Sequence, residues 1–441
     1  MSNVELGLWS FPVLLLLIFL RMPIGLAMLL VGVIGNYLIT KSFNPGLAIF
    51  KSLTYSTFSS YSLSVVPLFL LMGQFAAIGG LSQQLFNAAA SWLGHRRGGV
   101  AMAAIGASAG FGAICGSSLA TAATMGQIAL PELRKHGYSG GLATGTLAAG
   151  GTLGILIPPS VILVIYAILT EQNIAKLFIA AMIPGLLAAL GYIIAISVVV
   201  RLRPKEAGQP YPRVPYAERF KLLLSIWPVL LVFFLVIGGI YLGWFTPTEA
   251  AAIGAAGTGI IALLNGGFKR GTFTRSILQM ARTTGMIFII ILGAAALNNF
   301  LALSQLPQAA AGFVVDQGFN PWVILILVLL FYLVLGCFMD SLSMVLLTVP
   351  VIYPIVTALD FGLPPDEFAA WFGILILIVV EVGLITPPVG LNLFVINTMS
   401  KDTPLSHTYR GVLPFIMADI VRTSLLVLFP PITLFLLRLL Y

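Results

Sequence analysis

The stretch GTLGILIPPS, residues 151–160, decides the fold of this chain. It lies inside an apolar segment that is long enough to cross a membrane as a helix. Pro158 and Pro159 remove two backbone donors, and Pro158 disfavours the helical conformation at Ile157. In lipid, the carbonyls freed by such a break must be satisfied by protein or by a polar cavity. The stretch therefore predicts a helix that is broken within the membrane, beside a site for a cation or a polar solute.

The same device occurs a second time, in GLITPPVGLN at residues 383–392. Around these two breaks, the chain of 441 residues is 59% hydrophobic and only 8% charged. A soluble domain cannot bury that share of apolar surface, so the composition indicates an all-α polytopic membrane protein embedded in a lipid bilayer. The formal net charge of +8 comes from basic residues in short loops between apolar segments. This is the positive-inside pattern, and it argues against nucleic acid as a partner.

Two further units are built from apolar limbs shorter than the ~20 residues that a full span needs. The first, about residues 98–136, has basic residues at both ends. We interpret it as a re-entrant hairpin that opens to the cytoplasm, with Gly116, Ser117 and Ser118 at its tip. The second, about residues 320–357, carries CFMDSLS at its tip and is followed by an acidic loop, so we expect it to open outward.

The two halves of the chain repeat one plan. Ser118-Leu119 corresponds to Ser341-Leu342, and Pro158-Pro159 corresponds to Pro387-Pro388. Counting spans gives each element of the second half the orientation opposite to its twin, which predicts an inverted-topology repeat of five spans and one hairpin per half, as found in secondary transporters. The expected units are a first repeat at 1–200 with a broken helix at about 139–169, a basic cytoplasmic loop at 201–221, and a second repeat at 222–441 with a broken helix at about 367–400.

The candidate binding residues lie at the two tips and the two breaks. Hard cations take oxygen ligands from hydroxyls, carboxylates and carbonyls. The first half offers such oxygens, or glycine and proline positions that free carbonyls, at Gly116, Ser117, Ser118, Thr121, Gly151, Thr152, Gly154 and Pro158. The second half offers them at Asp340, Ser341, Ser343, Gly383, Thr386, Pro387 and Asn392. We expect each tip to meet the break of its own half, giving two related sites, and helix N-termini at the tips suit a carboxylate substrate.

The other charged residues in the apolar segments have competing interpretations. Asp340 is interpreted as functional because a carboxylate inside a membrane costs of order 3 kcal/mol or more, and a structural pair with a Lys or Arg is the alternative. Glu381 either takes part in function or anchors the second break. Glu249 is expected to cap a helix near the outer surface, whereas Asp419 and Arg422 are expected to pair with each other.

The sequence gives no indication of an enzyme or of a cofactor. His95, His136 and His407 lie in predicted loops without the spacing of metal ligands, and there is no phosphate-binding glycine loop. An intramembrane hydrolase would have only Asp340 and Glu381 as paired carboxylates. A channel or passive pore is the main alternative to a transporter, but the tips carry Ser, Thr and Asp in place of a hydrophobic constriction or a filter ring.

Five long stretches give the chain a family resemblance. They are CGSSLATAATMGQIALPELRKHGYS (115–139), AAGGTLGILIPPSVILVIYAILTEQNIAKLFIAAMIPG (148–185), FTPTEAAAIGA (245–255), FMDSLSMVLLTVPVIYPI (338–355) and EVGLITPPVGLNLFVI (381–396). On these stretches the chain resembles the large membrane subunit (the M, or DctM-like, subunit) of tripartite ATP-independent periplasmic (TRAP) transporters. The resemblance extends over essentially the whole chain.

The resemblance implies a sodium-coupled importer of a small organic acid, such as a C4-dicarboxylate or a sialic acid, in a bacterial inner membrane. It implies two partners: a periplasmic protein that captures the substrate and a small membrane (Q) subunit, expected here as a separate chain. It implies an elevator movement of the hairpins and broken helices against a fixed scaffold, with sodium ions as coupling ions and no cofactor. The implied sodium and substrate shell consists of the Gly-Pro breaks together with Ser117, Ser118, Thr121, Asp340, Ser341 and Thr386.

Overall fold

The computed structural model describes residues 1–269 and 271–441, apart from the side chains of residues 43 and 45–50. Within this part the regular structure is entirely helical, as the composition predicts. Five helices are long and apolar enough to cross a membrane, and up to seven spans result when each of two bent helix pairs is counted as one. The ten expected spans are not reached by this criterion, because several of them are apolar helices of 10–17 residues.

The first half contains ten α-helices and one short 3-10 helix. Their bounds are α1 (Asn3–Phe19), α2 (Ile24–Thr40), α3 (Phe43–Phe58), η1 (Tyr61–Ser64), α4 (Val65–Ile78), α5 (Leu81–Leu93), α6 (Gly99–Cys115), α7 (Ser118–Lys135), α8 (Gly140–Leu156), α9 (Val161–Leu169) and α10 (Ile174–Leu202). Helices α6 and α7 form the first expected hairpin. Helix α3 has no counterpart among the expected elements.

The second half follows a short 3-10 helix, η2 (Pro204–Glu206). Its helices are α11 (Tyr216–Ser225), α12 (Trp227–Phe233), the π-helix η3 (Phe234–Gly238), α13 (Gly239–Tyr241), α14 (Pro247–Leu264), α15 (Thr272–Ser304), α16 (Leu306–Asp316), α17 (Pro321–Gly336), α18 (Ser341–Thr357), α19 (Pro365–Gly383), α20 (Leu391–Met399), α21 (Leu405–Leu428) and α22 (Pro430–Leu440). Helices α17 and α18 form the second expected hairpin.

One expected boundary differs from the structure. The connection between the halves is shorter than 201–221, because α10 continues to Leu202 and α11 begins at Tyr216. The chain ends in two helices, since α21 ends at Leu428 and α22 begins at Pro430, which cannot donate a backbone hydrogen bond to the preceding turn.

The first break forms where the prolines require it. Ile157 leaves the helical region with φ −96° and ψ 121°, and α9 then begins after Ser160, whose hydroxyl accepts a hydrogen bond from the Leu163 amide. Helices α8 and α9 meet at an angle of 45°. The second break is longer and covers residues 384–390, between α19 and α20. The helix is therefore interrupted at both proline pairs.

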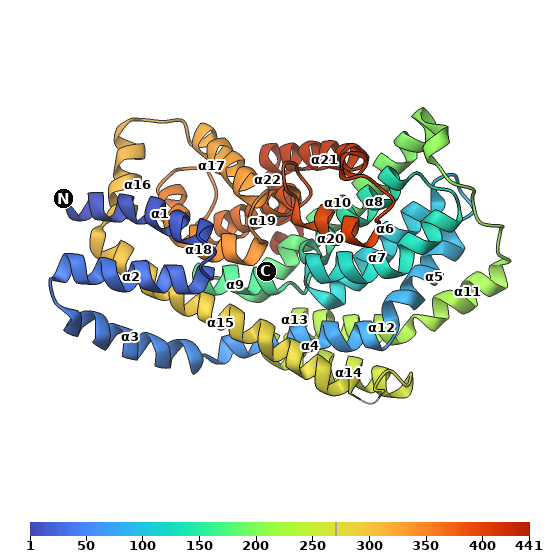
Figure 1. Ribbon diagram of the computed structural model, residues 1–441, viewed down its shortest axis with the longest axis horizontal. Coiled ribbons are helices and arrows are strands. Elements are labelled where there is room, and N and C mark those ends of the chain that lie inside the picture. The colour runs from blue at the N-terminus through green and yellow to red at the C-terminus, as the bar shows by residue number, and fades with distance from the viewer. Residues whose placement is uncertain (270) are drawn as a thin grey trace.

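The helices fall into two groups (Figure 1). Helices α2, α3, α4, α14 and α15 lie along one long edge of the molecule, with α2 packed on α15 and α4 packed on α14. The hairpin α6–α7 packs against α8, and the hairpin arm α17 packs against α19. Helix α21 packs on both α8 and α10, which joins the two halves of the chain. The hairpins and the first broken helix lie directly beside this edge, since α4 packs on α6 and α9, and α15 packs on α18.

Candidate functional site

The tip of the first hairpin is a glycine turn followed by a serine cap. Gly116 ends α6 with φ +64°, a left-handed conformation that glycine adopts without steric cost. The Ser117 hydroxyl caps α7 by accepting a hydrogen bond from the Ala120 amide at 3.5 Å. Ser118 and Thr121, in the first turn of α7, are buried. The turn between α6 and α7 thus consists of Gly116 and Ser117.

The first tip lies directly against the first break. A Cβ atom built on Gly112 in α6 would lie 2.6 Å from the Cα atom of Gly154 in α8. A Cβ atom on Gly154 would lie 2.7 Å from the Ser117 carbonyl oxygen, and one on Gly116 would lie 3.0 Å from the Pro159 carbonyl oxygen. The glycines therefore let hairpin and break approach backbone to backbone.

The tip of the second hairpin carries the carboxylate. Asp340 is the N-cap of α18, and its Oδ2 atom accepts a hydrogen bond from the Ser343 amide at 3.1 Å. No Lys or Arg in residues 1–269 and 271–441 forms an ion pair with Asp340. In this part of the chain, Asp340 therefore has no cation with which it could form a structural ion pair, which was the alternative interpretation.

The second tip lies against the second break in the same way. The Gly390 amide donates to the Cys337 carbonyl at 3.2 Å, and a Cβ atom on Gly383 would lie 2.6 Å from Gly336 Cα. Asn392, at the start of α20, is buried and donates from its side-chain amide to the Ala148 carbonyl of α8 at 3.3 Å. Asn392 therefore also connects the second break to the broken helix of the first half.

The two tips share one cavity of about 160 Å³. Its polar lining comes from both tips, namely Gly116, Ser117, Ser118, Asp340 and Ser341. Its remaining walls are apolar except for one hydroxyl, and come from Leu70, Leu119, Ile155, Val161, Ile162, Thr283, Met286, Ile287 and Leu342. The structure thus brings the two sets of tip residues together at one place. Thr283, on α15, is a polar lining residue that sequence reasoning missed.

The other candidate residues lie behind this cavity or beside the breaks. Those that do not line it are Thr121, Gly151, Thr152, Gly154, Pro158, Ser343, Gly383, Thr386, Pro387 and Asn392. The Thr386 hydroxyl donates to the Val382 carbonyl at 2.6 Å, and the Thr152 hydroxyl donates to the Ala149 carbonyl at 2.7 Å. The proton of each hydroxyl is held by a backbone carbonyl three or four residues earlier, which is common for Thr in membrane segments.

Glu381 is fully buried directly behind the second tip. Its Oε1 atom accepts a hydrogen bond from the Ser341 hydroxyl at 2.7 Å, and Ser118 of the first tip interacts with the same carboxylate. Its Oε2 atom is buried without a hydrogen-bond partner among the described residues. The sequence left the role of Glu381 open, and the structure connects it to both tips.

A second buried polar group joins α8, α10 and α21. Asp419 and Arg422 form an ion pair at 2.8 Å, as the sequence predicts. The Tyr192 hydroxyl donates to Asp419 Oδ2 at 2.7 Å and lies 3.0 Å from the Thr152 hydroxyl. This chain of contacts reaches from the broken helix α8 to α21.

Glu249 forms a capping box with Thr246 at the start of α14, as expected for a helix cap. The Glu249 amide donates to the Thr246 hydroxyl at 3.3 Å, and the Thr246 amide donates to Glu249 Oε2 at 2.8 Å.

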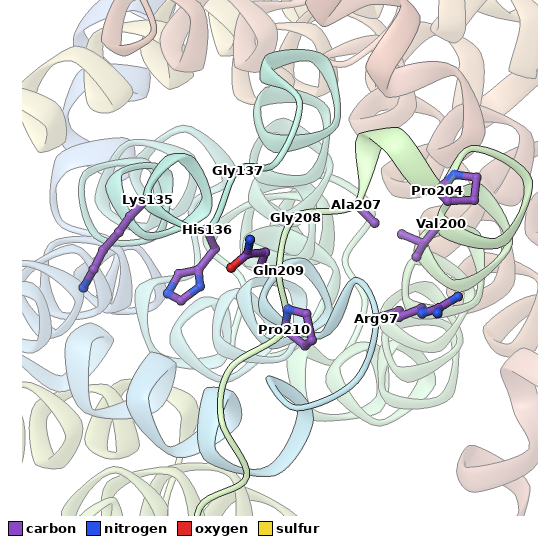
Figure 2. A pocket seen from close by; sticks show the side chains of 10 residues that line it. All are labelled: Arg97, Lys135, His136, Gly137, Val200, Pro204, Ala207, Gly208, Gln209 and Pro210. Carbon is purple, nitrogen blue, oxygen red and sulfur yellow. The ribbon is translucent and has the colours of Figure 1, made fainter.

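A larger cavity, of about 710 Å³, lies away from the tips, beside the connection between the halves (Figure 2). Figure 2 shows Lys135 and His136 on one side of segment 204–210 and Arg97 on the other. The Gln209 amide donates to the His136 carbonyl at 2.7 Å, which ties this segment to the end of α7. Among the described residues, no cluster of His, Cys, Asp or Glu has the arrangement needed to hold a metal ion.

Comparison with known proteins identifies the family. The family model described as "Tripartite ATP-independent periplasmic transporter, DctM component" matches residues 11–432. The chain is 37% identical to the C4-dicarboxylate TRAP transporter large permease protein DctM of Pseudomonas aeruginosa, over 86% of this chain and 87% of that protein. It is 32% identical to the sialic acid TRAP transporter large permease protein SiaM of Vibrio cholerae, over 95% of this chain and 96% of that protein.

Two further comparisons concern size and fold. The chain is 31% identical to the isethionate TRAP transporter permease protein DctMQ of Oleidesulfovibrio alaskensis, over 82% of this chain but only 56% of that longer protein. Its fold is similar to that of the Alcanivorax borkumensis YdaH transporter, with a TM-score of 0.64 and 15% sequence identity, over 87% of this chain and 88% of that one. The chain therefore belongs to the DctM family, the large membrane permease components of TRAP transporters, and is a multi-pass protein of the inner membrane.

Proposed function

We propose that this chain is the large transmembrane subunit of a sodium-coupled, binding-protein-dependent secondary transporter that imports a small organic acid. The observation that carries the proposal is the cavity shared by the two hairpin tips. One carboxylate, Asp340, and the hydroxyls of Ser117, Ser118 and Ser341 converge there from segments more than two hundred residues apart in the sequence. Convergence of this kind is expected for a binding site and is not required for folding either half.

The chemistry of the cavity suits a hard cation. Sodium takes hydroxyl, carboxylate and carbonyl oxygens, as other hard cations do, and all three kinds occur at the tips and the breaks. Asp340 supplies a negative charge that no described Lys or Arg neutralises. We therefore assign the sodium-binding role to the tip residues, with the carbonyls freed near Gly154 and Gly383 as further ligands.

The same geometry suits a carboxylate substrate next to the cation. Helices α7 and α18 begin at Ser118 and Ser341, so their positive N-terminal ends point to the shared cavity. The relatives named for C4-dicarboxylates and sialic acid carry substrates with carboxylate groups. We propose a small organic acid of this class as the substrate.

Movement of the tips and breaks as one unit explains how a buried site opens to both sides. In this proposal the moving unit contains α6–α9 and α17–α20, and the long edge formed by α2, α4, α14 and α15 is the scaffold. The matching backbone contacts of Gly112 with Gly154 and of Gly336 with Gly383 support an inverted repeat with units at about 1–200 and 222–441, joined by the basic connection. A rigid-body, elevator-type movement keeps these contacts intact.

Two partner proteins complete the proposal. The family description names a tripartite, periplasmic transporter in which DctM is one component. The chain matches relatives called large permease proteins over nearly their full length. We therefore propose a small membrane subunit, as a separate chain, and a periplasmic binding protein that delivers the substrate.

Uptake into proteoliposomes tests this function. The vesicles contain this chain with its small subunit, the binding protein is added outside, and a labelled carboxylate is offered with or without an inward sodium gradient. Uptake that requires both sodium and the binding protein is the expected result. Uptake at the same rate with and without a sodium gradient would contradict the proposed cation-binding role of the tips. Fast uptake without the binding protein would favour a passive pore.

A further inference from the structure

We propose that an anionic phospholipid binds to this chain on the side predicted to be cytoplasmic, with its phosphate among Arg96, Arg213 and Arg219 and one acyl chain in a cavity between α12 and α14. This lipid site is separate from the cavity at the hairpin tips. It combines a cluster of cations without a carboxylate partner, an exposed apolar face on α11, and a largely apolar cavity with a few polar residues.

The end of α5 and the start of α11 form one junction. The Tyr211 amide donates to the Gly94 carbonyl at 2.9 Å, which holds the connection between the halves on the end of α5. The rings of Trp92 and Phe220 meet edge to face, with their centroids 5.5 Å apart. Helix α11 therefore packs on α5 (Figure 1), and the side chains that follow Gly94 lie close to those of the connection.

Four basic side chains gather at this junction, namely His95, Arg96, Arg213 and Arg219. Burial of His95, together with the positive charges of the three arginines, lowers the pKa of its imidazole. The Nδ1 atom of His95 is buried without a hydrogen-bond partner among the described residues. No carboxylate in the described part of the chain forms an ion pair with any of the three arginines. The junction therefore carries positive charge that these residues leave unneutralised.

Arg219 is the buried member of this cluster, with 6% of its surface exposed. Its Nε atom donates to the Val214 carbonyl at 2.8 Å, and its Cζ atom lies 4.9 Å from the centre of the Tyr216 ring. Both partners are neutral, whereas a buried charge is costly unless an opposite charge accompanies it. The adjacent carboxylate, Glu218, is exposed and is in no ion pair among the described residues. An anion from outside the chain would neutralise Arg219, and a planar guanidinium matches the oxygens of a phosphate.

The exposed face of α11 favours a lipid as the source of that phosphate. Tyr216, Phe220 and Leu224 are 69%, 53% and 69% exposed, and they lie on one side of the helix because they are four residues apart. Only Ile226 separates α11 from α12, and the two helices meet at 45° at the end of a candidate membrane span. A helix with an apolar face and neighbouring cations at the end of a span is suited to the headgroup region of a bilayer, where phosphates are the abundant anions.

A cavity of about 640 Å³ offers room for an acyl chain. Its polar lining residues are Gln84, Ser225 and Asn265, and its other walls are apolar side chains of α12, η3 and α14. The Oε1 atom of Gln84 is buried without a hydrogen-bond partner among the described residues. Ser225 is the last residue of α11, six residues after Arg219, which corresponds to about 9 Å along a helix. One lipid molecule can therefore reach both the cations and the cavity.

Native mass spectrometry of the purified chain, titrated with phosphatidylglycerol in detergent, tests the headgroup site. Arg96 and Arg213 are exposed, so the double variant Arg96→Gln with Arg213→Gln should fold normally. We expect the dissociation constant for phosphatidylglycerol to rise about 25-fold, because each cation near lipid headgroups contributes a factor of about five. Arg275→Gln, which removes an exposed cation on α15, should change it little. Wild-type affinity in the double variant, or an equal loss in Arg275→Gln, would overturn the proposal.

Two substitutions of Arg219 separate its charge from its packing. Arg219→Gln removes the charge and should weaken phosphatidylglycerol binding by about fivefold or more. Arg219→Lys keeps the charge and should retain most of the affinity. The melting temperature of each variant shows that it is folded. Equal weakening in both variants would contradict the role of this charge in binding the phosphate.

Competition identifies the anion. Phosphatidylethanolamine, whose net charge is zero, should bind more weakly than phosphatidylglycerol, and an excess of inorganic phosphate should not displace phosphatidylglycerol. Equal binding of the two lipids would contradict recognition by charge. Displacement by inorganic phosphate would mean that the cations take a free anion, and would overturn the assignment to a lipid.

Filling the cavity tests the position of the acyl chain. Ala256 is an exposed residue that lines the cavity, so Ala256→Phe should weaken phosphatidylglycerol binding several-fold. Ala252→Phe is the matched control, because Ala252 is exposed one turn earlier on α14 and does not line the cavity. Unchanged binding in Ala256→Phe would overturn this placement of the chain. These measurements need neither sodium nor a partner protein, so their outcome is independent of the proposed transport function.

Discussion

Gly336 and Gly383 are in direct backbone contact where the second hairpin meets the second break: a Cβ atom on Gly383 would lie 2.6 Å from Gly336 Cα. Gly383→Ala therefore forces the hairpin away from the break. We expect a loss of about 1–3 kcal/mol of stability from overpacking and an uptake rate lower by about tenfold or more, measured by thermal unfolding in detergent and by proteoliposome uptake.

Gly312→Ala is the control for this substitution. Gly312 lies within helix α16, and a Cβ atom built there meets nothing within 4 Å. Alanine should preserve uptake and stabilise the helix slightly, by up to about 1 kcal/mol. Equal losses in both variants would mean that the Gly336–Gly383 contact has no special role.

Asp340 can be tested for charge separately from capping. Asparagine caps a helix about as well as aspartate, so Asp340→Asn should preserve the bond from the Ser343 amide and the stability to within about 0.5 kcal/mol. If the carboxylate binds the cation, sodium-driven uptake should fall at least about tenfold. Asp340→Ala should lose uptake and, in addition, about 1 kcal/mol of stability. If the Asp340→Asn variant took up substrate at the wild-type rate, the proposed role of Asp340 in cation binding would be contradicted.

The buried pair of Asp419 and Arg422 should be far more sensitive to single substitutions than an exposed pair. Arg422→Met leaves the Asp419 carboxylate buried without its cation, at an expected cost of about 3–5 kcal/mol. The double variant Asp419→Leu with Arg422→Met should recover much of this loss. Arg438→Gln, which breaks a solvent-exposed pair with Glu367, should cost about 1 kcal/mol or less. Melting temperatures in detergent measure all of these.

The connection between the halves should be held on the first hairpin by Tyr211. Its hydroxyl donates to Glu132 at 2.8 Å, and burial together with Glu132 raises its pKa, so the donor proton is retained at neutral pH. Tyr211→Phe should speed limited proteolysis of segment 203–215 several-fold, since a hydrogen bond to a charged group is worth about 1.5–3 kcal/mol. Tyr216→Phe, an exposed position, should leave the rate unchanged. Equal rates in both variants would contradict this anchoring.

Much of this architecture can be predicted from residues that are close together in the sequence. Hydropathy alone predicts that the helices lie in a membrane. The proline pairs at 158–159 and 387–388 interrupt the helix after α8 and between α19 and α20, whatever those helices pack against. The Asp419–Arg422 pair and the Glu249 cap also follow from residues close together in the chain. Helix α3 was not predicted, because residues 41–63 are rich in Ser, Thr and Tyr and show no clear helical periodicity of apolar residues.

Only the tertiary structure decided how the two halves meet. Sequence reasoning expected one site per half, whereas packing brings Ser117 and Asp340 to one cavity and adds Thr283 from α15. The tertiary structure also shows which hydroxyls are already engaged, since those of Thr152 and Thr386 donate to the backbone carbonyls of Ala149 and Val382. The physical reason is that a break or a tip is fixed by the torsions of a few adjacent residues. Which carboxylate lies behind which hydroxyl, as Glu381 lies behind Ser341, depends on contacts between helices that no local pattern encodes.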